Sequence, residues 1–87
     1  MEREFYNRGL DKALQGDFKG AIQDFDQALQ INPQFAEAYY NRAITYRRLN
    51  NRQAAVADFQ KSADLFKSQG RTESYQDALE ATKSLQR

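Results

Sequence analysis

Apolar residues recur every three or four positions along most of the chain, which is the spacing of one face of an α-helix. After Gly16 they stand at Ala21, Ile22, Phe25, Ala28 and Leu29. The same spacing returns further along the chain at Val56, Phe59, Ala63 and Phe66. Shorter versions of this pattern precede each of the two segments. We therefore predict four helices, at about residues 3–15, 18–31, 36–49 and 52–68.

Residues that favour helix ends separate these segments. Gly16 tolerates the left-handed conformation that closes a helix, and the carboxylate of Asp17 can accept the free N–H groups of the next one. Asn50-Asn51 offers the same two properties 34 residues later. Asn32-Pro33 ends the second helix, because proline cannot continue it and disfavours helical geometry in the residue before.

The sequence also repeats itself. The tripeptide YNR that begins at Tyr6 is found again at Tyr40, 34 residues later. At the same offset three further pairs are identical: Ala21 with Ala55, Asp24 with Asp58, and Phe25 with Phe59. Matches at one fixed offset in separate segments indicate a repeated pair of helices, and about 34 residues is the period of one kind of helix–turn–helix array.

The first copy, FYNRGLDKALQGDFKGAIQDFDQALQINP, resembles a tetratricopeptide repeat (TPR). The resemblance rests in the first copy on Phe5, Gly9, Gly16-Asp17-Phe18, Ala21, Phe25, Ala28 and Pro33, and in the second on Tyr39, Ala43, Tyr46, Ala55 and Phe59. The copies depart from the family pattern at Lys12, Ser62 and Lys67. The resemblance implies an all-α fold, in which TPR-type helix–turn–helix repeats form a short right-handed α-solenoid with a capping helix.

The capping helix is expected in the last segment, about residues 72–86, with Thr72 as its N-cap. One face of this segment carries Tyr75, Ala78, Leu79, Thr82 and Leu85. Such a stripe can cover the open end of a repeat array while the polar back of the helix meets water. We expect residues 1–87 to be a single TPR domain, with repeat 1 at about 2–35 and repeat 2 at about 36–68. The N-terminal end shows no comparable cap.

The matched positions have a packing interpretation. Gly9 and Ala43 let the two helices of each pair approach closely, and Phe25 and Phe59 fill the space between them. Burial of one such ring is worth about 1.5–3 kcal/mol. The alternative is a generic amphipathic bundle, in which small and aromatic residues occupy the matched repeat positions by chance.

A basic–acidic pair repeats as well. Arg8 and Asp24 recur as Arg42 and Asp58 at the same separation. We hypothesise a structural ion pair that ties the first helix of a repeat to the second. The alternative is that the charges are independently solvated, since exposed pairs contribute little stability.

The composition and charge of the chain exclude some classes of function. The 13 basic and 12 acidic residues leave a formal net charge of +1, whereas a general nucleic-acid binder carries a marked basic excess. The mean hydropathy is −0.92, and no stretch has the apolar length of a membrane span. The first residues, MEREFYNR, lack the apolar centre of a signal peptide. Because no cysteine is present to form disulfides, we expect a cytoplasmic protein. From the balanced charge and the lack of an apolar span we expect that it binds neither nucleic acid nor membrane.

The chain also contains no histidine. Without histidine and cysteine it lacks the usual zinc ligands, the Ser-His and Cys-His nucleophile pairs and the commonest general base. We therefore expect no catalytic residues, no metal, no cofactor and no enzymatic activity. A bound metal or cofactor in the purified protein would reopen the enzyme interpretation.

The resemblance implies a site for a peptide or protein partner of unknown identity. In this family the first helix of each repeat lines a concave groove. Transferred by position, the peptide-binding residues are Tyr6, Leu10, Ala13, Leu14, Tyr40, Asn41, Ile44, Arg47 and Arg48. Tyr6 and Tyr40 follow the core aromatics by one residue, so we expect them to face the open side, with Arg47 and Arg48 as a cationic end. The alternative is that these are ordinary surface side chains.

Two expectations concern the partner. The chain lacks most of the lysine, asparagine and arginine set with which one TPR subclass binds chaperone tails, so we expect no binding of that kind. The alternative function is a self-assembling, homo-oligomeric scaffold that uses the uncapped N-terminal face. The glutamine-rich surface resembles bacterial members of the family.

Overall fold

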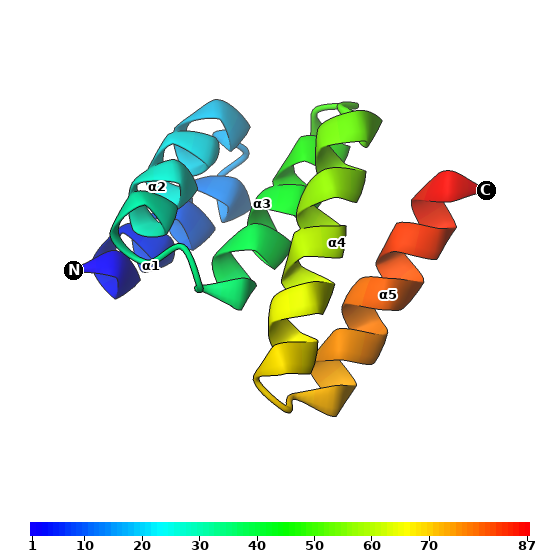
Figure 1. Cartoon of the computed structure of the whole chain (residues 1–87). Coiled ribbons are helices and arrows are strands. Elements are labelled where there is room, and N and C mark those ends of the chain that lie inside the picture. Colours follow the sequence, from blue (N-terminus) through cyan, green and yellow to red (C-terminus); the bar gives the residue numbers. More distant parts are fainter.

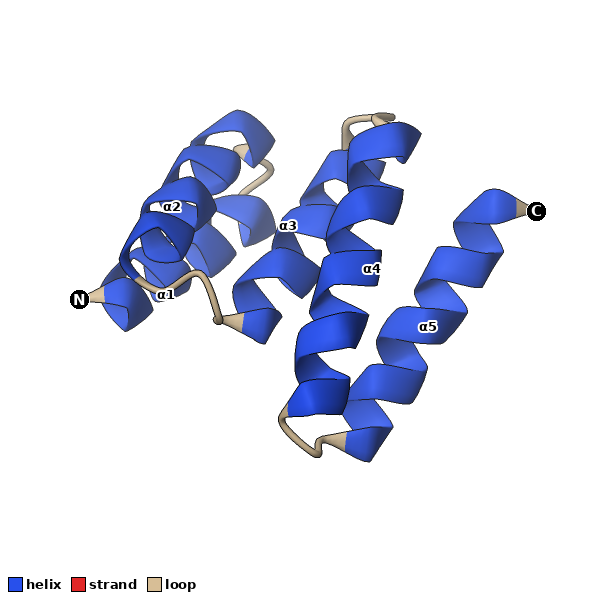
Figure 2. Cartoon of the chain, viewed as in Figure 1, coloured by secondary structure: helices blue, strands red, loops and turns tan.

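The computed structural model describes all 87 residues, Met1–Arg87. It consists of five helices and no strand (Figures 1 and 2). The helices are α1 (Glu2–Leu14), α2 (Phe18–Ile31), α3 (Ala36–Arg48), α4 (Arg52–Ser68) and α5 (Thr72–Gln86). Each helix begins and ends within one residue of the expected position, which confirms the all-α fold class.

The helices are arranged as a row of hairpins. Figure 1 shows the hairpin α1–α2, then the hairpin α3–α4, and then α5 alone, with the two termini at opposite ends of the row. Helix α2 packs on α3, so the hairpins stack directly on each other, and α5 packs on α4. This side-by-side stacking is the geometry of a repeat solenoid, in which each unit contacts only its neighbours.

The helix ends use the residues that the sequence indicates. Gly16 has a positive φ of 84°, and the carboxylate of Asp17 accepts a hydrogen bond of 3.0 Å from the backbone N–H of Gly20. Thirty-four residues later, Asn50 has a φ of 62° and Asn51 caps α4. The predicted symmetry of the two hairpin turns is confirmed.

One predicted cap is wrong. Helix α5 begins at Thr72, and its N-cap is Arg71, which makes no side-chain capping hydrogen bond. The hydroxyl of Thr72 is therefore already inside the first turn, where it cannot accept the N–H groups that a capping side chain accepts.

The close packing of each hairpin depends on its small residues. Phe25 and Phe59 are fully buried, as is Ala43. A Cβ atom placed on Gly9 would lie 2.7 Å from Cε1 of the Phe25 ring, too near for two carbon atoms in contact. The expectation that Gly9 permits a close approach of α1 and α2 is confirmed.

Helix α5 covers α4 with the face that the sequence indicates. Ala78 and Thr82 are buried, and the other members of the stripe are half-buried: Tyr75, Leu79 and Leu85. Ala78 packs in one cluster with Ala63 and Phe66. The polar back of the helix is exposed, so α5 closes this end of the core.

Candidate interaction surface

Two ion pairs fix the first helix of each hairpin to the second. Arg8 donates to the two carboxylate oxygens of Asp24, from Nε at 3.0 Å and from Nη2 at 2.8 Å. Arg42 donates to Asp58 in the same way, from Nε at 2.7 Å and from Nη2 at 2.9 Å. The hypothesis of a repeated structural ion pair is confirmed, and each pair lies within one repeat.

Arg42 also joins the two repeats. Its Nη1 donates to Asp26 of α2 at 2.7 Å, so one guanidinium contacts a carboxylate of repeat 1 and a carboxylate of repeat 2. Burial disfavours the charge of Arg42, but the hydrogen bonds and charges of Asp58 and Asp26 outweigh it, and the pKa of Arg42 is raised. The arginine thus stays charged and holds the first helix of repeat 2 against its neighbours.

The ion pair of the first repeat includes a second basic residue. Lys12 occupies the place of Tyr46 and contributes Nζ at 3.0 Å from Oδ2 of Asp24. Asp24 is therefore shared between Arg8 and Lys12. This contact gives a physical role to the lysine that departs from the family pattern.

A hollow of about 310 Å³ lies between α1 and α3. We call it the α1–α3 hollow. Its lining is Leu10, Ala13, Leu14, Phe18, Asn41, Ile44, Thr45 and Arg48. Six of the nine sequence-predicted residues are among these: Leu10, Ala13, Leu14, Asn41, Ile44 and Arg48. The structure thus brings most of the expected set together on the first helices of the two hairpins.

The sequence argument missed two lining residues, Phe18 and Thr45. Phe18 opens α2 immediately after the turn, and the chain contains no pattern that marks it as facing a neighbouring repeat. Arg48 lies over its ring, with Cζ 4.9 Å from the ring centroid. The contact extends the apolar lining and holds the guanidinium at its edge.

The edge of the α1–α3 hollow combines apolar exposure with positive charge. Leu14 is 87% exposed, the most exposed of the large apolar side chains. Arg47 and Arg48, in the last turn of α3, form no ion pair with any residue of the chain. Their charge is available to a ligand, although part of it complements the C-terminal end of the α3 dipole.

The expected orientation of Tyr6 is wrong. Tyr6 is only 9% exposed and belongs to the core of the first hairpin. Its ring centroid lies 4.8 Å from that of Phe35 and 6.0 Å from that of Phe25. The reason is the α2–α3 connection, which brings Phe35 onto the side of α1 that would otherwise be open.

Hydrogen bonding secures the buried Tyr6. Nδ2 of Asn41 donates to its hydroxyl oxygen at 2.9 Å and to the carbonyl of Glu37 at 3.0 Å. Burial, ahead of the charge of Glu37, raises the pKa of Tyr6. Both donors of the Asn41 amide are thereby used, so Asn41 links the two repeats as well as lining the hollow.

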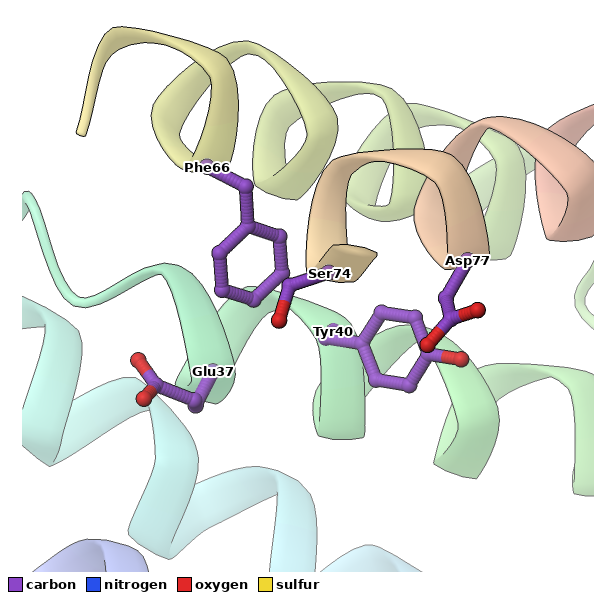
Figure 3. Close-up of a pocket in the computed structure, with 5 residues that line it drawn as sticks. All are labelled: Glu37, Tyr40, Phe66, Ser74 and Asp77. Atoms are coloured by element: carbon purple, nitrogen blue, oxygen red, sulfur yellow. The ribbon is translucent and has the colours of Figure 1, made fainter. Parts of the chain in front are cut away.

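Tyr40 and Arg47 do not line the α1–α3 hollow. Tyr40 is half-buried, with its ring meeting Phe59 at 5.2 Å and Phe66 at 6.4 Å between centroids. It lines a second hollow of about 160 Å³, between α3 and α5, which Figure 3 shows. Arg47 lies over Phe59, with Cζ 5.7 Å from its centroid.

The acidic side chains do not assemble into a group of three or more that could hold a metal ion. None of the five helices has the length and apolar character needed to cross a membrane.

Comparison with known protein families identifies both repeats. A family model described as "TPR repeat" matches residues 9–50, and one described as "Tetratricopeptide repeat" matches residues 36–68. Together they span residues 9–68, which include the second half of α1 and all of α2, α3 and α4. The second match coincides with the hairpin α3–α4.

Relatives of known name carry the same repeat. Tetratricopeptide repeat protein 36 of Danio rerio is 40% identical over 65 residues, 75% of this chain and 35% of that protein. Its homolog from Nematostella vectensis is 35% identical over 68 residues, 78% of this chain and 38% of that protein. Serine/threonine-protein phosphatase T of Trypanosoma brucei is 40% identical over 62 residues, 70% of this chain and 13% of that protein. The chain thus spans little more than a third of the length of the first two relatives. Because all three relatives are eukaryotic, the bacterial origin of this chain stays a prediction.

Solved structures agree in fold. The crystal structure of a tetratricopeptide repeat domain protein from Salinibacter ruber has a TM-score of 0.89, covering 99% of this chain and 96% of that one, at 14% identity. A solution structure of a tetratricopeptide repeat domain protein from the same organism gives the same TM-score over 98% of this chain and 86% of that one. At this identity the likeness shows the fold alone. Tetratricopeptide repeats mediate protein–protein interactions, and on its two matched repeats and its all-α solenoid the chain belongs to the tetratricopeptide repeat family.

Proposed function

We propose that this chain is a non-enzymatic interaction module that binds a peptide segment of a protein partner in the α1–α3 hollow. In this proposal residues 1–87 act as one domain, with two repeats and a capping helix. The observation that carries it is an apolar hollow between the first helices of the repeats, edged by an arginine, Arg48, that forms no ion pair in the chain. The partner, on this account, is a protein rather than a nucleic acid or a membrane.

The apolar lining favours an apolar side chain of the partner. Leu10 and Ile44 come from opposite walls, and Leu14 extends the apolar surface toward the open end. A ligand side chain that fills the hollow would remove these groups from water, a gain of about 1.5–3 kcal/mol for one large aliphatic residue. Such a contact is the usual anchor of a peptide interface, with polar contacts around it.

The arginines favour an acidic residue beside that anchor. Arg48 is held at the edge of the hollow by Phe18, so less side-chain freedom is lost when it binds. The guanidinium of Arg48 matches the two oxygens of a carboxylate. Arg47 lies over Phe59 outside the hollow and adds only its positive charge nearby. The ligand that fits best therefore carries an apolar residue followed or preceded closely by an aspartate or glutamate.

Self-assembly through the N-terminal face is the alternative. The outer side of α1 carries a hollow of about 230 Å³ lined by Met1, Glu4, Phe5 and Arg8. At the stacked interface between repeats, the position equivalent to Glu4 is Ala38, which is fully buried. Stacking a second copy in the same manner would place the Glu4 carboxylate in an apolar interface, so we rank this function second. A monomer whose mass by light scattering does not change with concentration would dismiss it.

Selection from a random twelve-residue peptide library tests the primary proposal. We expect the wild-type protein to enrich peptides that contain the apolar–acidic pair. The variant Leu10→Asp/Ile44→Asp should not retain them, whereas the matched variant Gln23→Asp/Gln60→Asp, which changes exposed positions on the second helices, should. Circular dichroism must show that all three proteins remain folded. Peptides that bind the two variants equally, or no enrichment with wild type, would refute the proposal.

A further inference from the structure

The second hollow, between α3 and α5, is built partly by the capping helix. We call it the α3–α5 hollow; its lining is Glu37, Tyr40, Phe66, Ser74 and Asp77. Figure 3 shows the hydroxyl end of Tyr40 beside the carboxylate of Asp77, with Glu37 on the other side of the ring of Phe66. Of these five residues the sequence indicated only Tyr40. Helix α5 therefore closes the core and also supplies a wall of the α3–α5 hollow.

The chain itself shows how this corner holds a guanidinium. Nη2 of Arg71 lies 2.9 Å from Oε2 of Glu37, and Cζ of Arg71 lies 4.8 Å from the centroid of the Phe66 ring. A carboxylate and an aromatic ring thus bind one basic group together. This combination is favourable because the ring face attracts the cation while the carboxylate pairs with it.

Asp77 and Tyr40 present the same two chemical groups without a basic partner. Asp77 forms no ion pair with any residue of the chain. Burial, and after it the charge of Asp77, raises the pKa of Tyr40, so its phenol stays neutral at physiological pH. The positive charge of Arg47 lowers the pKa of Tyr40, but its guanidinium lies over the ring of Phe59 and not in the α3–α5 hollow.

We propose that the α3–α5 hollow binds a basic side chain, arginine or lysine, of the partner segment, with the cation against the ring of Tyr40 and paired with Asp77. This inference rests on the proposed function and deepens it. Tyr40 and Ile44 are one helical turn apart and so lie on one face of α3. The two hollows flank this helix, one on the side of α1 and one on the side of α5. A partner that places its acidic residue at Arg48 and its basic residue at Asp77 is bound in one direction across α3.

An NMR titration of the full chain with N-acetylarginine amide tests the inference. We expect saturable shifts of the backbone amides of Tyr40, Ser74 and Asp77. The neutral isostere N-acetylcitrulline amide should bind about three- to fivefold more weakly, which is what one exposed charge pair supplies. Asp77→Asn should weaken arginine binding by the same factor, whereas Asp64→Asn, at an exposed carboxylate of α4 without an ion pair, should leave it unchanged.

The outcomes separate the inference from the proposed function. Equal binding of the arginine and citrulline probes, equal binding by Asp77→Asn, or shifts centred elsewhere would overturn the inference. If the arginine probe fails while library peptides still bind in the α1–α3 hollow, the proposed function stands without the basic subsite. If the arginine probe binds as expected and no library peptide is enriched, the subsite stands and the peptide proposal fails.

Discussion

The guanidinium of Arg42 donates two parallel hydrogen bonds to the carboxylate of Asp58, one of 2.7 Å from Nε and one of 2.9 Å from Nη2. The Arg42 side chain is only 19% exposed. A partly buried charge that loses its partner is costly, because the desolvation remains while the attraction is gone. The ion pair is therefore a testable element of the stability of the fold.

We predict that Asp58→Ala lowers the free energy of unfolding by about 2–3 kcal/mol, somewhat below the loss for a fully buried pair because Asp26 still contacts Arg42. Urea denaturation followed by circular dichroism measures it. Asp64→Ala, at an exposed position of the same helix, serves as control and should change the value by less than about 0.5 kcal/mol. Equal stability of the two variants would mean that the Arg42–Asp58 pair contributes nothing.

The equivalent pair in the first repeat predicts a pH dependence. The hydrogen bond from Arg8, followed by the effects of Lys12, lowers the pKa of Asp24 below its ordinary value of 3.8 despite burial. Because the pKa is depressed in the folded state, the stabilisation is fully present above the unfolded value and is lost as the pH falls through the folded one. The free energy of unfolding of wild type should therefore decrease as the pH falls below about 4.

Asp24→Asn isolates that contribution. Asparagine keeps the shape of the side chain but cannot lose or gain a proton, so the variant should be less stable at pH 7 and should lose less stability between pH 5 and pH 2.5. Urea denaturation at several pH values provides the comparison. A variant curve parallel to that of wild type would rule out Asp24 as a source of the acid sensitivity.

We predict that Gly9→Ala destabilises the first hairpin even though alanine is the better helix former. The added Cβ would meet the ring of Phe25, and overpacking costs about 1–3 kcal/mol against a gain in helix propensity of up to about 1 kcal/mol. Thermal denaturation of Gly9→Ala, Phe25→Leu and the double variant gives the coupling between the two sites. If the smaller leucine does not reduce the cost of the alanine, the close approach is not what requires glycine.

The buried position of Tyr6 leads to a further prediction. Tyr6→Ala should cost about 3 kcal/mol, within the range for loss of a large buried side chain, and Tyr6→Phe about 1 kcal/mol through loss of the hydrogen bond from Asn41. Chemical denaturation of the two variants measures both losses. A loss of less than about 0.5 kcal/mol for Tyr6→Ala would return Tyr6 to the surface of the groove.

The sequence was sufficient for the fold because its local signals agree with each other. Gly16 and Asn50 mark turns by their left-handed conformation, and Pro33 marks the end of α2. The 34-residue offset then pairs Arg8–Asp24 with Arg42–Asp58, a contact that helix periodicity alone would not have indicated. Each of these signals depends on a residue and its near neighbours, or on the repeat.

The candidate site was only partly predictable, because it depends on how loops and neighbouring helices cover a face. Phe35 lies in a connection, and nothing in the sequence shows that it packs on Tyr6. Ser74 and Asp77 lie outside the apolar stripe that the sequence indicates for α5, yet both line the α3–α5 hollow. Leu10 and Ile44 were found because they follow the repeat.

The most direct test of the account is a methyl NMR titration of the ¹³C-labelled protein with a library-selected peptide, followed at the methyl groups of Leu10, Leu14 and Ile44. The account predicts saturable shifts of the methyl groups of these three residues, with those of Val56 on α4 unaffected. Shifts concentrated at Val56, with Leu10 and Ile44 unchanged at saturation, would place the partner on another surface and contradict the assignment of the α1–α3 hollow.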